Sequence, residues 1–251
     1  MNLNIPPSSN RSLENIILCS CPLEGTIGVS CRRTIFTSMK KLIVLSLFFP
    51  LFGWTQSAND ILTKAISYHD PSNSWQKLDA TLSFTETRPE GADRKTTVVI
   101  NNKTGEVTIN RNDEEIYKVV GDKAEMVKGD KEEDRGLILR NYYLYLWGLP
   151  MKLKDESTPE ITLEDQAEVN GETTNVLRVE YEADTWYFYF DEETGRMLEY
   201  KFYKDEEAGK GELLKLEEEV EIDGIKIPKK RSWYTLPEMK YLGTDILDGA
   251  E

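Results

Sequence analysis

The chain contains no cysteine after Met39, because Cys19, Cys21 and Cys31 all precede that residue. A Cys-Ser-Cys pair with a third cysteine would suggest metal or redox chemistry only if this segment belonged to the mature protein. If translation starts at Met39, the protein has neither a disulfide bond nor a thiol nucleophile. No cysteine follows the apolar run after Met39, so a lipidated N-terminus is not expected.

Histidine is almost as scarce, since His69 is the only one in the chain. The step from His69 to Asp70 could serve acid–base chemistry, but no serine or cysteine nucleophile motif accompanies it. A histidine at the end of a helix is also favourably placed near the negative end of the helix dipole. We therefore interpret His69 as structural and assign no catalytic residue.

Motifs for phosphate, metal and nucleophilic chemistry are absent as well. The sequence has no glycine-rich phosphate loop and no nucleophile elbow. Four acidic clusters occur, and none has the spacing of a calcium loop; they are 130–134, 191–193, 205–207 and 217–219. We interpret them as solvated surface and expect no metal and no cofactor. A hydrolase that uses two carboxylates stays open as an alternative, because nothing singles out a pair.

No apolar run is long enough to span a membrane, which takes about 20 residues. The longest candidate, residues 42–52, follows Met39 and two lysines and precedes small residues at Thr55 and Ser57. This order is typical of a cleavable secretory signal peptide, with cleavage expected after Ser57. The sequence thus predicts three segments: a misassigned upstream extension (1–38), a signal peptide (39–57) and a single domain (58–251). A genuine extension at 1–38 is the alternative.

Positive charge is in short supply in the predicted mature chain. Residues 58–251 carry 26 basic and 43 acidic side chains, a net charge of −17. Such a chain is repelled by nucleic acids and by anionic membrane surfaces. We expect a monomer, located in the periplasm or secreted, with no nucleic-acid partner.

Most of the mature chain shows the alternation of apolar and polar residues that is typical of strands. Asn170-Gly171 and Asp223-Gly224 predict two-residue hairpin turns. In the second hairpin Ile222 should oppose Ile225, and Glu221 should oppose Lys226. The pattern predicts a mainly β, α+β fold: a curled antiparallel sheet or half-barrel of about nine to ten strands.

Two helices interrupt the strands. The first should begin at a cap formed by Asn59 or Asp60 and end before Asp70-Pro71. The second lies within residues 134–147 and is rich in leucine and tyrosine, with Gly148 and Pro150 after it. A helix that is apolar nearly all round is expected to be buried against the sheet.

Aromatic residues offer the best candidates for a binding site. Trp186 and Phe188 share one face of a predicted strand, while Tyr187 and Tyr189 share the other. A strand that is apolar on both faces is covered on both, and this pattern fits either ordinary core packing or a concave apolar cavity with the inserted helix as a lid. For the cavity, we predict that the ligand contacts are Leu139, Tyr143, Trp147, Trp186 and Phe188.

The order of signal peptide, first helix, curled sheet and inserted apolar helix is similar to the half-barrel of LolA- and LolB-type periplasmic lipoprotein carriers. Locally, the segments YHDP (68–71), YLWGLP (145–150) and YTLPEMKYLGTDIL (234–247) resemble an uncharacterised family of secreted bacterial proteins. The layout implies non-catalytic binding of a hydrophobic or lipid-like ligand. The alternative is an interaction module that binds an envelope protein, which would have a filled sheet interior and an exposed apolar patch.

Overall fold

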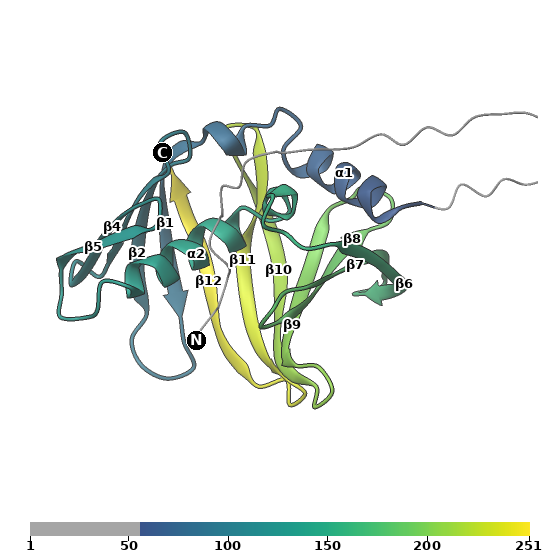
Figure 1. Cartoon of the computed structure of the whole chain (residues 1–251). Coiled ribbons are helices and arrows are strands. Elements are labelled where there is room, and N and C mark those ends of the chain that lie inside the picture. Colours follow the sequence, from purple (N-terminus) through teal and green to yellow (C-terminus); the bar gives the residue numbers. More distant parts are fainter. Residues whose placement is uncertain (1–55) are drawn as a thin grey trace, which may run out of the picture. The chain divides into compact units, whose positions relative to one another are not determined.

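The computed structural model describes residues 56–251, which contain a sheet of twelve antiparallel strands (Figure 1). The strand order across the sheet is β5-β4-β3-β2-β1-β12-β11-β10-β9-β8-β7-β6, so the curled sheet stays open with β5 and β6 as its edges. The strands are β1 (Asp79–Thr87), β2 (Arg94–Asn101), β3 (Glu106–Arg111), β4 (Glu115–Val120), β5 (Lys123–Lys128), β6 (Ile161–Val169), β7 (Glu172–Glu180), β8 (Thr185–Asp191), β9 (Met197–Asp205), β10 (Lys210–Ile222), β11 (Ile225–Leu236) and β12 (Tyr241–Ala250).

The predicted mainly β architecture is confirmed, but the predicted count of nine to ten strands is wrong. The strand that is hardest to recognise from the sequence is β12, which contains Gly243 and Gly249. Glycine inside a strand weakens the local signal, and here the pairing with β1 and β11 supplies the strand's hydrogen bonds. The predicted upstream extension and almost all of the predicted signal peptide lie outside the described residues.

The cap of helix α1 (Ala58–His69) lies two to three residues before the predicted caps, Asn59 and Asp60. Ser57 is the N-cap, and its hydroxyl accepts a hydrogen bond from the Asp60 backbone N–H at 3.2 Å. The Asp60 carboxylate in turn accepts the Ser57 backbone N–H at 3.1 Å, which completes a capping box. Ser57 is therefore the cap, and Asp60 is a first-turn residue whose carboxylate accepts the Ser57 backbone N–H.

Helix α2 (Arg135–Trp147) confirms the predicted inserted helix and ends at Gly148. It contacts β3, β4 and β5 near its start, and its later side chains reach β1, β11 and β12. The helix thus lies across one face of the sheet (Figure 1). Two short 3₁₀ helices, Trp75–Lys77 and Met151–Lys154, complete the described elements. Within residues 56–251 no helix is both long and apolar enough to cross a membrane.

The register of the hairpin that β10 and β11 form is as predicted. Ile222 pairs with Ile225, and Glu221 pairs with Lys226. Apolar pairs on one face and opposite charges on the other each contribute about 0.2–1 kcal/mol, so turn and side chains specify the same register.

The two faces of β8 separate as the alternation predicts. Trp186 stacks on Phe202 with ring centroids 4.7 Å apart and on Phe188 at 5.9 Å, within the main core. Tyr189 belongs to a second, small cluster on the opposite face. Tyr145 of α2 meets Trp186 edge to face at 5.9 Å, so α2 supplies part of the cover over this strand.

His69 ends α1 in a fully buried position where both ring nitrogens are bonded. The backbone N–H of Met197 donates to Nε2 at 3.0 Å, so Nδ1 carries the proton and donates to the Lys226 carbonyl at 2.7 Å. Burial lowers the pKa of His69 below its usual 6.5, and the Lys226 hydrogen bond opposes this only in part. His69 is therefore a neutral link between α1 and two strands of the sheet.

We expect stability to fall as the pH drops below about 6.5, because the unfolded chain then protonates His69 before the folded chain does. The slope should be visible in urea denaturation from pH 7.5 to 5. Comparison with His69→Gln isolates the effect, because burial raises the pKa of Asp245 and that group changes stability in the opposite direction. An identical slope in the variant would contradict this account.

Candidate functional site

A row of charged residues, three of them buried and one half-buried, crosses four neighbouring strands beneath α2. Strand pairing places Arg94 of β2 opposite Glu86 of β1, Glu86 opposite Asp245 of β12, and Asp245 opposite Arg231 of β11. Glu86, Asp245 and Arg231 are 1%, 7% and 0% exposed. Buried charges are rare unless they are paired and hydrogen-bonded, so this row is the most distinctive feature of the interior.

Glu86 is held from three directions. Its Oε1 accepts hydrogen bonds from the hydroxyls of Tyr143 and Thr96, the latter at 2.8 Å. Its Oε2 pairs with Arg94 and lies 3.9 Å from Arg111 and 3.8 Å from Arg88. One carboxylate thus faces three guanidinium groups, and its charge is shared among them.

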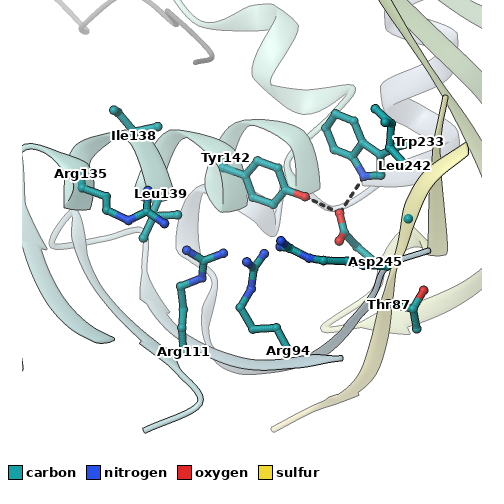
Figure 2. Close-up of a pocket in the computed structure, with 12 residues that line it drawn as sticks. Thr87, Arg94, Arg111, Arg135, Ile138, Leu139, Tyr142, Trp233, Leu242 and Asp245 are labelled. Carbon is teal, nitrogen blue, oxygen red and sulfur yellow. Dashed lines mark hydrogen bonds between the residues drawn. The ribbon is translucent and has the colours of Figure 1, made fainter. Parts of the chain in front are cut away.

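Asp245 links α2 to the sheet. Its Oδ2 accepts a hydrogen bond from Trp233 Nε1 at 2.8 Å and another from the Tyr142 hydroxyl (Figure 2). Tyr142 and Trp233 stack with ring centroids 5.7 Å apart. Burial raises the pKa of Asp245 above its usual value, although both hydrogen bonds act in the other direction.

Arg231 closes the row under the end of α2. Its guanidinium carbon lies 3.5 Å from the centre of the Trp147 ring, and Nη2 donates to the Leu146 carbonyl at 2.9 Å. Cations interact favourably with aromatic faces and with the carbonyls at a helix C-terminus. Arg231 therefore fixes α2 on β11.

A pocket of about 380 Å³ opens between α2 and this row. Its apolar wall comes from α2, β11 and β12, through Ile138, Leu139, Tyr142, Trp233 and Leu242. Ile138 is 38% exposed, whereas Leu139 and Trp233 are buried, so the wall deepens from the surface inward. Pockets of about 300–1,000 Å³ with a mainly apolar lining and a few polar groups are typical small-molecule sites.

The pocket also has a cationic part. Four arginines line it: Arg88 follows β1, Arg94 and Arg111 lie on β2 and β3 across from α2, and Arg135 begins α2 itself. Figure 2 shows the guanidinium groups of Arg94 and Arg111 directed up toward the helix. Thr87, Gly243 and Asp245 complete the lining. An amphipathic pocket therefore exists in a chain that is strongly acidic overall.

The five residues predicted as ligand contacts are all buried, with exposures of 7% or less. Only Leu139 lines this pocket. Tyr143 and Trp147 point from α2 toward the sheet and pack against Phe84, with ring centroids 5.5 and 4.6 Å away. Trp186 and Phe188 lie on β8, in the part of the core away from the pocket. Their contact with a ligand stays a prediction.

The arginines and their acidic partners were not predicted. Glu86 continues the inward series of Leu82 and Phe84, and Asp245 precedes Leu247 in the same way. A charged residue at an inward position of an alternating strand is the signal that could have revealed the row. Within residues 56–251, no group of three or more histidine, cysteine or acidic side chains is arranged to hold a metal ion.

A family model described as a family of unknown function (DUF6503) matches residues 40–248. The chain belongs to this family. No curated protein matches it. The predicted resemblance to an uncharacterised family is therefore confirmed, and family membership by itself assigns no activity.

Solved structures add the fold. The LolA superfamily protein NE2245 from Nitrosomonas europaea aligns with a TM-score of 0.50 and 10% identity, over 78% of this chain and 93% of that one. A DUF1329 family protein from Desulfovibrio piger aligns with a TM-score of 0.46 and 10% identity, over 78% of this chain and 93% of that one. At this identity the first similarity shows the fold alone, and the predicted LolA-like layout is confirmed.

Proposed function

We propose that the protein binds an amphiphilic, lipid-like molecule, without catalysis, in the pocket between α2 and the sheet. The observation that carries the proposal is the pocket's two-sided lining. Apolar side chains of α2, β11 and β12 form one wall, and arginines form the other. A ligand that satisfies both walls needs a hydrocarbon part and a polar part.

The LolA-like fold supports this proposal, since carriers of that type bind lipid-modified proteins. The packed aromatic side chains of β8 and β9 limit where in the sheet interior a ligand can lie. Trp186, Phe188, Tyr200 and Phe202 pack against one another there, so the ligand is expected at the α2 end. The predicted export signal fits a role in the periplasm or outside the cell, and the protein is proposed to act as a monomer.

The first test is native mass spectrometry of the protein purified without detergent. We expect extra mass that is released as lipid on denaturation, or uptake of dodecanoate or phospholipid by the bare chain. A chain that stays bare after both incubations would overturn the proposal and favour a module that binds an envelope protein.

A matched pair of variants places the ligand. Ile138→Ser should lower the affinity for dodecanoate by about fivefold or more, because each buried methylene contributes about 0.8 kcal/mol. Leu163→Ser is the control, since Leu163 on β6 is 41% exposed against 38% for Ile138 and lies outside the pocket. Affinity is measured by titration calorimetry. Equal losses in both variants would contradict this site.

A further inference from the structure

The pocket walls carry more positive than negative charge. Arg88, Arg94, Arg111 and Arg135 line the pocket, whereas Asp245 is the only acidic residue among the described ones that line it. Glu86 and Glu115 are not among the residues that line the pocket, but both lie within 4 Å of the Arg111 guanidinium. If all these groups are ionised, four positive charges face three negative ones.

The carboxylates already have their partners. Glu86 accepts from Tyr143 and Thr96 and pairs with Arg94, while Glu115 lies 3.3 Å from Arg111 and pairs with Arg135. Asp245 accepts from Tyr142 and Trp233. Of these acids, Glu86 keeps one oxygen, Oε2, that is buried without a hydrogen bond while it faces three guanidinium groups.

Two of those donors are orphaned. The Nε atoms of Arg94 and Arg111 are buried and have no hydrogen-bond partner among the described residues. The side chain of Arg111 is only 6% exposed, so bulk water does not replace the missing partner freely. A buried donor left without an acceptor costs about 1–3 kcal/mol, more when it is charged. Two unsatisfied guanidinium donors thus stand against one unsatisfied carboxylate oxygen, Glu86 Oε2, so the site is short of one acceptor.

The positive charges of the Arg94 and Arg111 guanidinium groups also repel each other. Burial lowers the pKa of Arg94, and the positive charge of Arg111 lowers it further. An anion between them would relieve both effects. The planar fork of arginine fits the oxygens of a carboxylate or a phosphate, which accept two parallel hydrogen bonds.

We infer that Arg94 and Arg111 recognise a carboxylate or phosphate group, so that the amphiphile bound in this pocket is anionic. The inference rests on the proposed function and names the class of its ligand. The head group lies against β2 and β3, and the hydrocarbon part lies along α2 toward Ile138.

The test compares three probes on the full protein by titration calorimetry: dodecanoate, dodecan-1-ol and inorganic phosphate. Dodecanoate should bind about tenfold more tightly than dodecan-1-ol, because hydrogen bonds to charged groups are the stronger ones. Phosphate alone should bind more weakly than dodecanoate, because it leaves the apolar wall unused.

Arg94→Gln should remove most of the preference for dodecanoate over dodecan-1-ol. Arg140→Gln is the matched control, because Arg140 lies on α2 outside the pocket with a side chain 16% exposed, against 21% for Arg94. A thermal melt checks that each variant folds. If Arg94→Gln does not fold, the comparison of dodecanoate with dodecan-1-ol on the unaltered protein decides.

The outcomes separate the two ideas. Equal binding of dodecanoate and dodecan-1-ol would overturn the anionic head group and leave the lipid-binding proposal standing. Binding of neither amphiphile would overturn both. Phosphate that binds as tightly as dodecanoate would show a small-anion site and overturn the amphiphile. A preference for dodecanoate that Arg94→Gln abolishes and Arg140→Gln preserves would support the inference.

Discussion

Replacing Trp147 with alanine should lower the free energy of unfolding by about 3–5 kcal/mol, the range for truncating a fully buried tryptophan. The Trp147 ring is 0% exposed and packs on Phe84 with centroids 4.6 Å apart. The substitution also removes the ring that covers the Arg231 guanidinium. Arg231 Nε and Nη1 have no hydrogen-bond partner among the described residues, so losing this contact adds to the cost. Urea denaturation followed by circular dichroism measures the change.

Tyr241→Ala is the control, since Tyr241 is 37% exposed on β12 and its truncation should change stability by about 0.5 kcal/mol or less. A double-mutant cycle of Trp147→Leu with Arg231→Met measures the coupling between the two side chains. A loss below about 1 kcal/mol in Trp147→Ala would contradict the core role. If ligand affinity fell sharply at the same time, the predicted ligand contact at Trp147 would be supported.

Local signals explain what could be predicted of the fold. The Asp223-Gly224 turn fixes its hairpin through two residues, and the flanking pairs of isoleucine and of opposite charge agree with it. Helix α2 is recognisable from its leucine and tyrosine content and from Gly148. Each of these features depends on residues close together in the chain, which is why sequence patterns report them.

The candidate site depends on contacts that are distant in the chain. Glu86 meets Asp245 only because β1 pairs with β12, and β12 itself was missed. Arg94 and Arg111 lie at the open end of the hairpin that β2 and β3 form, and no local motif marks them as part of a binding site. The predicted aromatic contacts had a strong local pattern, yet that pattern reports burial, and a core needs it as much as a cavity does.

Helix α1 shows the same limit at small scale. Asn59 and Asp60 are both good caps by type, and the actual cap is Ser57, two residues before the first of them. The reciprocal Ser57–Asp60 bonds use the short spacing of a capping box, which is readable in the sequence once Asp60 is placed in the first turn. Side-chain type alone did not fix the boundary.

Two glycines on β12 provide a test of how closely β1 and β12 approach beside the pocket. Gly243 has φ +145°, and an added Cβ would lie 2.3 Å from the Thr87 carbonyl oxygen. Gly249, on the same strand, would meet nothing within 4 Å. Gly243→Ala should therefore cost about 2–4 kcal/mol through backbone strain and overpacking. Gly249→Ala should change the free energy of unfolding by about 0.5 kcal/mol or less.

Gly243→Ala should also disturb the ligand site, because Gly243 and Thr87 both line the pocket. The Thr87 carbonyl belongs to backbone, so β1 must move away from β12 to admit the new methyl group. Dodecanoate affinity should drop in Gly243→Ala even where the variant remains folded, and stay unchanged in Gly249→Ala. Urea denaturation and calorimetry on the two variants give both quantities. Equal stability and equal affinity in the pair would contradict a close approach of β1 and β12 at Gly243.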